Sequence, residues 1–138
     1  MPADELYVFD ACAVVALIQR EPGAEVVIEI LKNPRNRCLL HTVNACEVYY
    51  DLYRRGGEKE ASRLEELLAT AGIELVEMIP SSLWQTAGKP KAEWRRVSLA
   101  DCFALAFAVL EGGTVLTSDH HELDPIAQAA LCPIRFIR

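Results

Sequence analysis

Residues 6–10 read Leu-Tyr-Val-Phe-Asp, and this stretch decides the fold of the chain. Four apolar or aromatic residues end at one carboxylate, and the apolar stretch from Ala11 to Ile18 follows at once. The first stretch is typical of a fully buried strand and the second of a helix packed over it. Asp10 would then lie at the carboxyl end of a buried strand, where open α/β sheets bind ligands. Alternatively, Asp10 only caps the following helix, since Asp is a good N-cap residue.

Length and composition predict one folded domain that spans residues 1–138. Apolar residues make up 51% of the chain and charged residues 25%, which is ordinary for a globular protein with a real core. No apolar run approaches the length of a membrane span. The first residues, Met1 to Glu5, lack the basic region of a signal peptide. We therefore expect a cytoplasmic protein with no membrane contact.

The cysteines support the same compartment. There are five, an odd number, and none forms a C-x-x-C pair: Cys12, Cys38, Cys46, Cys102 and Cys132. This pattern suits a reducing cytosol in which thiols behave as small hydrophobic groups, and it offers no spacing that favours a zinc site.

The net charge is −6, from 14 basic and 20 acidic side chains. A monomeric nucleic-acid-binding protein is usually basic, so this balance argues against extensive, sequence-independent phosphate binding. It remains compatible with a metal site that needs acids, or with a partner that supplies positive charge.

Predicted strands and helices alternate along the chain, with no internal repeat. The strands cover residues 6–10, 38–41, 73–79, 114–117 and 134–137. Five helices cover residues 12–20, 24–32, 44–55, 58–71 and 125–131. A sixth begins at Ser81 and breaks around Gly88-Lys89-Pro90, and a seventh runs from Ser98 to Gly112. Five strands separated by helices predict a three-layer α/β fold around a five-stranded parallel sheet.

Asp101 is the only charge in the apolar segment 99–110. A helix that is apolar all round must be buried, and a lone buried carboxylate is costly without a cation or hydrogen-bond donors. The alternative is a cap: Ser98 and Asp101 fit a capping box with Asp in place of Glu, and the helix dipole favours an acid there. A functional site is the better explanation, because capping alone does not require so buried a position.

Two further acids occupy comparable positions. Asp119 follows the strand that ends near Thr117, or else it is a turn residue before His120-His121. Glu47 ends the stretch Asn44-Ala45-Cys46-Glu47, which could be a capping box. Together with Asp10 and Asp101, two acids end strands and two lie in the first turns of helices.

In a parallel sheet these positions all face the same edge. Four carboxylates cannot crowd together as bare anions at pH 7, because like charges raise one another's pKa. A hard divalent cation such as Mg²⁺, which prefers oxygen ligands and works on phosphates, would resolve the repulsion. The pattern therefore predicts a carboxylate metal site.

Five short motifs, in this order and spacing, are similar to those of a known family. They are Phe9-Asp10-Ala11-Cys12-Ala13, Arg20-Glu21-Pro22-Gly23-Ala24-Glu25, Asn44-x-x-Glu47, Ser98-Leu99-Ala100-Asp101 and Leu116-Thr117-Ser118-Asp119-His120-His121-Glu122. With them the whole chain resembles the PIN-domain nucleases, and within these the VapC-type toxins of bacterial and archaeal toxin–antitoxin pairs.

The resemblance implies strand order 3-2-1-4-5 and a Mg²⁺- or Mn²⁺-dependent endoribonuclease that hydrolyses RNA phosphodiester bonds. It implies a cognate antitoxin as partner, and we also expect a homodimer. Asp10, Glu47, Asp101 and Asp119 fall on the family's acidic quartet, which makes them the catalytic and metal-binding candidates. The chain departs from the family at Cys12, where members often carry Ser, Thr or Asn, and a thiol is a poor Mg²⁺ ligand.

Several other side chains are candidates for contacts. Four basic residues before Asp101 could hold RNA phosphates or form a solvated surface: Lys89, Lys91, Arg95 and Arg96. His120 could also contact RNA, or lie in a solvent-facing turn. Aromatic residues could form an antitoxin or dimer surface, or pack in the core: Tyr49, Tyr50, Tyr53 and Trp84.

Three rival functions fit parts of the pattern. A haloacid-dehalogenase-type phosphatase needs a second Asp two residues after the first, where this chain has Cys12. A receiver-like domain needs an acceptor Asp at the end of strand three, where this chain has Met78-Ile79-Pro80. The third is a catalytically inactive PIN-like module that only binds protein. The complete quartet argues against it, and a metal titration would distinguish the two.

Overall fold

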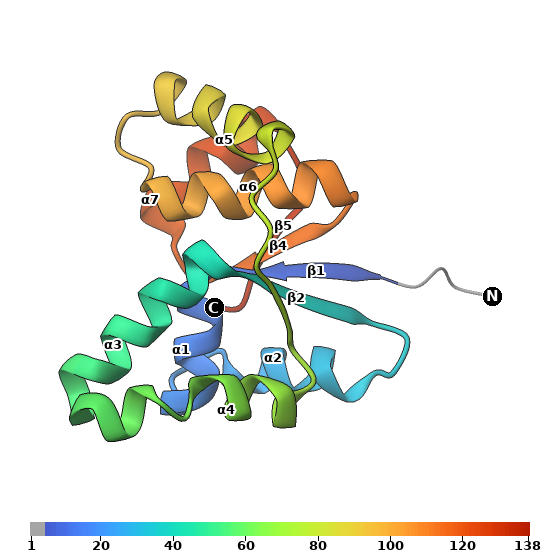
Figure 1. Ribbon diagram of the computed structural model, residues 1–138. Helices are drawn as coiled ribbons and strands as arrows, with labels where there is room; N and C mark the ends of the chain where they lie inside the picture. The colour runs from blue at the N-terminus through green and yellow to red at the C-terminus, as the bar shows by residue number, and fades with distance from the viewer. Residues whose placement is uncertain (1–4) are drawn as a thin grey trace.

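The computed structural model describes residues 5–138 (Figure 1). The prediction made for the first residues of the chain lies, apart from Glu5, outside this described part. Within residues 5–138, no helix is both long and apolar enough to cross a membrane.

A five-stranded parallel sheet forms the centre of the molecule (Figure 1). Its order is β3-β2-β1-β4-β5, which confirms the expected order. The strands are β1 (Leu6–Phe9), β2 (Arg37–His41), β3 (Glu74–Val76), β4 (Thr114–Thr117) and β5 (Ile134–Phe136).

The central strand β1 determines where the chain leaves the sheet. Phe9 is in register with Leu40 of β2 on one side and with Leu116 of β4 on the other. The backbone N–H of Asp10 still donates to the carbonyl of Leu116, at 3.1 Å. Asp10 is therefore the first residue beyond the buried ladder, at the carboxyl edge of the sheet.

Helices cover both faces of the sheet, as the apolar runs of the strands require. One face carries α1 (Ala11–Gln19), α2 (Ala24–Lys32) and α4 (Leu64–Ala71), and the other carries α5 (Ser81–Glu93), α6 (Leu99–Glu111) and α7 (His120–Ala129) (Figure 1). Neighbouring strand residues divide between the two cores: Phe9 packs on the α1 side and Val8 on the α6 side. Helix α3 (Thr42–Ala61) begins at the carboxyl edge of β2.

The start of α3 differs from the prediction. The buried ring of His41 is the N-cap: its Nδ1 accepts from the Val43 N–H at 3.3 Å, and its Nε2 donates to the Met78 carbonyl at 2.9 Å. The predicted capping box at Asn44 is therefore wrong. Because the helix begins at Thr42, Glu47 lies in its second turn and not in the first.

One predicted helix break is confirmed and a second is not. The backbone leaves helical geometry at Gly57, with φ 72° and ψ −166°, so the predicted stop at Gly56-Gly57 is a kink between two helical parts of α3. Helix α5 continues through Pro90 and ends at Glu93, so the break predicted there is wrong. A proline so near the end of a helix removes a single backbone hydrogen bond, and the Trp94 N–H still donates to the Pro90 carbonyl at 2.8 Å.

Candidate metal centre

The two carboxylate oxygens of Asp10 have different environments. Its Oδ1 accepts from the Ala13 N–H at 2.9 Å and so caps α1. Its Oδ2 is fully buried and has no hydrogen-bond partner among the described residues. The structure therefore confirms Asp10 as a helix cap, and a ligand at its other oxygen stays a prediction. A buried acceptor without a partner is costly, so this oxygen is available to a ligand.

Three other carboxylates meet at the same edge of the sheet. Asp101, Asp119 and Glu122 each offer one oxygen atom, and these atoms lie within 4.8 Å of one another. Asp101 is buried in the first turn of α6, and its N–H donates to Oγ of the N-cap Ser98 at 3.1 Å. The structure thus brings two of the four predicted acids together, with Glu122 as a third member.

Glu122 is the site residue that the sequence analysis missed. A turn was expected at His120-His121 and a helix only from Pro125, but α7 begins at His120 with Asp119 as its N-cap. Oδ1 of Asp119 accepts from the Glu122 N–H at 3.0 Å. The signal was present, because an N-cap Asp followed by Glu three residues later is the spacing of a capping box.

Glu47 lies beside this group. It is half-buried in α3, and it lines a pocket with Cys12 and Ser118 that adjoins the carboxylates. Asn44 holds α3 in place: its Nδ2 donates to the Ala100 carbonyl at 3.1 Å, directly before Asp101. The catalytic and metal-binding roles of Asp10, Glu47, Asp101 and Asp119 stay predictions.

The acids perturb one another electrostatically. Burial raises the pKa of Asp10 to about 7, partly opposed by the Thr117 hydroxyl and the Ala13 N–H and reinforced by the charges of Asp119 and Glu47. Burial also raises the pKa of Asp101 well above its usual range, helped by a hydrogen bond with the Glu122 carboxyl group and by the nearby negative charges. Burial and the charge of Glu122 raise the pKa of Glu47.

The raised pKa values of Asp10, Glu47 and Asp101 mean that burial and neighbouring negative charges disfavour the ionised carboxylates. In the chain alone, the raised pKa of Asp101 means that this carboxyl group keeps its proton to higher pH, which reduces the repulsion. A hard divalent cation would relieve it better, because several carboxylate oxygens and an unpaired Asp10 oxygen are the donors that Mg²⁺ and Mn²⁺ prefer. The residues present therefore fit a divalent cation.

Cys12 is a poor candidate for metal binding or nucleophilic attack. Burial, and then the charges of Asp10, Asp101 and Asp119, raise its pKa to about 12. The thiol therefore stays protonated at neutral pH, so it is neither a thiolate nucleophile nor a good metal ligand. The five cysteines all lie within the described residues and are free thiols.

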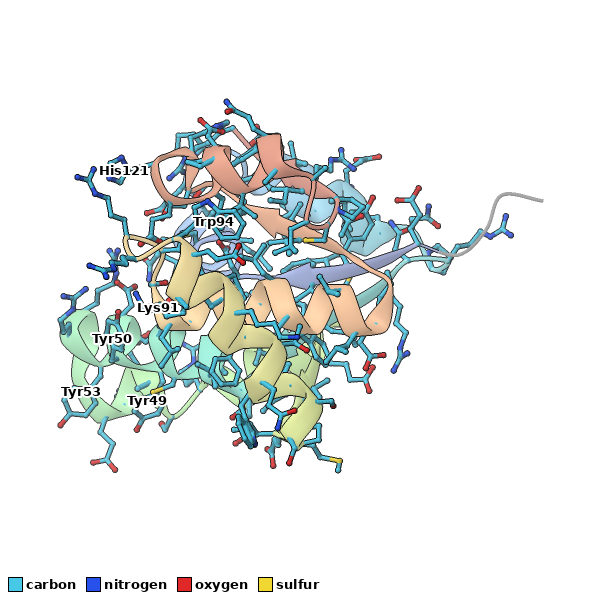
Figure 2. The ribbon with its side chains drawn as sticks, turned by 90° about the horizontal axis from the view of Figure 1, so that it is seen from above. Tyr49, Tyr50, Tyr53, Lys91, Trp94 and His121 are labelled. Atoms are coloured by element: carbon cyan, nitrogen blue, oxygen red, sulfur yellow. The ribbon has the colours of Figure 1, made fainter. Side chains whose placement is uncertain are left out.

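Lys91 contacts the backbone of its own chain (Figure 2). Its Nζ donates to the carbonyls of Arg95 at 2.8 Å and Val97 at 2.7 Å, in the loop that leads to Ser98. The other basic candidates, Lys89, Arg95 and Arg96, are exposed. Their contacts with RNA stay predictions.

His120 joins α7 to the end of the chain. Its Nδ1 lies 2.9 Å from Oδ1 of Asp124, its Nε2 lies 2.7 Å from the Arg138 carbonyl, and its ring stacks on Phe136. Both partners are acceptors, and these hydrogen bonds raise the pKa of His120. RNA contact by His120 stays a prediction.

Comparison with known proteins gives one family and several related structures. Residues 7–127 match the family model of the PIN domain. No curated protein sequence matches the chain. The DNA-bound VapBC complex from Salmonella typhimurium contains a chain that is 16% identical, with a TM-score of 0.74 over 97% of this chain and 99% of that one.

Two further structures give the same result. A chain of VapBC2 from Rickettsia felis is 17% identical, with a TM-score of 0.73 over 95% of this chain and 98% of that one. VapC20 from Mycobacterium tuberculosis, described as a Sarcin-Ricin loop cleaving toxin, is 17% identical, with a TM-score of 0.70 over 86% and 94%. At these identities the likeness concerns the fold.

Proposed function

This chain belongs to the PIN domain family, and on that premise we propose that it is a divalent-metal-dependent endoribonuclease and the toxin of a toxin–antitoxin pair. The observation that carries the proposal is the carboxylate group at the carboxyl edge of the sheet. Three oxygens lie within 4.8 Å of one another, beside a buried Asp10 oxygen that has no partner among the described residues.

In this proposal Asp101, Asp119 and Glu122 hold Mg²⁺ or Mn²⁺, and Asp10 and Glu47 complete the acidic site. The cation, when bound, would supply a water molecule of lowered pKa and would offset charge on the scissile phosphate. The chain supplies the framework: the N-termini of α1, α6 and α7 are capped by Asp10, Ser98 and Asp119 and converge on the site. Their dipoles add partial positive charge there.

Protons compete with the cation for the carboxylate oxygens of this site. The Asp101 carboxyl group, whose pKa is raised, must lose its proton before it can act as a ligand. Cation binding is therefore coupled to proton release and strengthens as the pH rises. In the reaction itself, a water oxygen bonds to phosphorus and one P–O ester bond of the RNA breaks.

The substrate and partners that we propose are inferred from related structures. Two of the similar chains come from VapBC complexes, and a third, VapC20, is described as a Sarcin-Ricin loop cleaving toxin. We propose the same classes for this chain: an RNA substrate, a cognate antitoxin, a second copy in a homodimer and a cytoplasmic location. A PIN fold used only as a protein-binding module would not need a group of acids at one edge of the sheet, three of which have a raised pKa.

Cleavage by the purified chain tests the proposal. Wild-type protein incubated with total RNA should cut it with Mn²⁺ or Mg²⁺ and not with EDTA. Asp119→Asn should lose at least about 100-fold in rate, because the amide keeps the shape and removes a ligand charge. Equal cleavage by the wild type and the variant, or cleavage in EDTA, would overturn the assignment.

A further inference from the structure

A pocket of about 230 Å³ adjoins the carboxylates on the side of α1 and α3. We call it the α1–α3 pocket. Its polar and aromatic lining consists of Cys12, Glu21, Glu47, Tyr50, Asp51, Arg54, Ser118 and Arg138. Glu47 belongs to the proposed acidic site and Ser118 directly precedes Asp119, so the pocket lies next to the place where the proposed reaction occurs.

One wall of this pocket is an exposed aromatic ring. Tyr50 is 49% exposed, although a tyrosine that only packed in the core would be covered. The tyrosines of α3 lie on the outside of the molecule (Figure 2), but of Tyr49, Tyr50 and Tyr53 it is Tyr50 that lines the pocket. The charge of Glu47 is the first cause that raises the pKa of Tyr50, which agrees with a ring that borders the acidic site.

Two guanidinium groups accompany the ring. The central carbon of the Arg54 guanidinium lies 5.5 Å from the ring centroid of Tyr50, a cation–π distance. Arg54 is largely exposed, and its carboxylate partner Asp51 is 3.5 Å away, at the limit of a hydrogen bond. The Arg138 guanidinium donates to the Pro22 carbonyl at 2.7 Å, and its carboxylate partner Glu21 is 3.9 Å away. The two guanidinium groups thus offset part of the negative charge of a lining that also contains three carboxylates.

We propose that the α1–α3 pocket is a nucleotide subsite for single-stranded RNA, in which a nucleobase stacks on Tyr50 and the adjoining phosphate pairs with Arg54 and Arg138. The inference rests on the proposed nuclease function and extends it to a nucleotide next to the scissile phosphate. A flat ring that stacks bases, together with arginines that neutralise phosphate, is the combination used by proteins that bind single strands.

The chemistry of the pocket favours RNA over a protein partner. An amphipathic helix would need a row of apolar side chains, whereas the lining here is mostly charged or polar around one aromatic ring. A more apolar groove lies elsewhere, between α3 and α4, with Leu64, Leu68 and Leu75 in its lining.

Binding without cleavage tests the inference. The probe is a fluorescein-labelled RNA dodecamer of random sequence, titrated with the full chain in EDTA and followed by fluorescence anisotropy. Tyr50→Ala should raise Kd by about 5- to 150-fold, the range for loss of one stacked base. Tyr50→Phe keeps the ring and should stay within about twofold of wild type. Tyr53→Ala, an exposed tyrosine outside the pocket lining, is the control.

An abasic dodecamer separates the ring from the charges. Against this probe Tyr50→Ala should bind as the wild type does, whereas Arg54→Gln should still weaken binding and lower the salt slope by about 0.7. Arg55→Gln is the matched control, because Arg55 pairs with Asp51 at 2.8 Å and does not line the pocket. Thermal melts establish that each variant is folded.

The results of these binding and cleavage experiments can overturn the subsite without overturning the nuclease function, and the reverse. If wild type cleaves RNA but Tyr50→Ala binds the random-sequence probe equally well, the inference is wrong and the function stands. Binding that depends on Tyr50 in a chain that never cleaves would sustain the subsite and overturn the nuclease. If Tyr50→Ala leaves RNA affinity unchanged and instead breaks a dimer or an antitoxin complex, the pocket is a protein surface and the inference is overturned.

Discussion

Oε1 of Glu122 accepts a hydrogen bond from the backbone N–H of Ser98 at 3.1 Å, across 24 positions of the chain. In an ordinary capping box, the third helical residue bonds back to the N-cap of its own helix. Here Glu122 is the third residue of α7, but it bonds to the N-cap of α6. One carboxylate thus ties together the two helix starts that carry Asp101 and Asp119.

Glu122 is expected to have two separable roles. Glu122→Gln keeps an acceptor for Ser98 but removes a charge, so the metal-free protein should melt at the same or a higher temperature, while the rise on adding Mn²⁺ should largely disappear. Glu122→Ala should in addition lose the bridge, at a cost of about 1 kcal/mol in the free energy of unfolding. Thermal melts with and without Mn²⁺ measure both effects, and Glu111→Gln, an exposed acid at the far end of α6, is the control. A full Mn²⁺ response in Glu122→Gln would contradict the role of Glu122 as a ligand.

The metal-free protein should lose stability as the pH rises. The pKa of Asp10 is raised from 3.8 to about 7 in the folded chain, with the charges of Asp119 and Glu47 among the causes. A raised acid pKa means that the folded state holds a proton which the unfolded state releases. The contribution of Asp10 is therefore fully present below about pH 4 and is lost as the pH passes through about 7.

Urea unfolding in EDTA between pH 5 and pH 8 measures this dependence. Asp10→Asn cannot ionise, so its unfolding free energy should fall less steeply over the same range. Mn²⁺ should reverse the trend in the wild type, because protons and the cation compete for the same oxygens. Identical pH profiles for wild type and Asp10→Asn would show that Asp10 ionises normally in the folded chain.

Lys91 is expected to position the loop before α6. Its ammonium group bonds to the carbonyls of Arg95 and Val97, and Val97 adjoins the N-cap Ser98. Lys91→Met keeps much of the stem but leaves both carbonyls without this donor, which should cost about 1–3 kcal/mol of unfolding free energy. The Mn²⁺ affinity should also fall, because Asp101 follows directly in the same segment. Lys89→Met, on the exposed surface of α5, should change neither measurement.

Expression in a host cell connects the site to the proposed biology. The wild-type chain alone should arrest growth, and co-expression of its antitoxin should restore it. Asp10→Asn should allow normal growth at an equal protein level, because it removes a charge of the acidic site without changing the shape of the side chain. Growth curves with protein levels measured by immunoblot give the comparison. Equal toxicity of the variant would mean that the harm to the cell is not enzymatic.

The local pattern of the sequence was enough to predict the five strands and two of the acids that meet at the edge of the sheet, Asp101 and Asp119. The buried strand before Asp10 and the cap formed by Ser98 are read from neighbouring residues, because periodicity and capping are local properties. The same local rules failed at the starts of α3 and α7. At α3 the cap is His41, which Met78 and the core around it hold in place. At α7 the predicted start, Pro125, lies within a helix that begins at His120.

Only the tertiary structure decided how the acids meet. Glu122 enters the site because it reaches Ser98, and α3 is held beside α6 because Asn44 donates to the Ala100 carbonyl, 56 positions away. Lys91 was grouped with the phosphate-binding candidates by its charge, yet its ammonium group is turned to its own backbone. Residue type and spacing determine which edge of a parallel sheet a side chain belongs to. Packing of the helices on that sheet determines which oxygen comes within reach of which partner, because those contacts join parts of the chain that no local pattern relates.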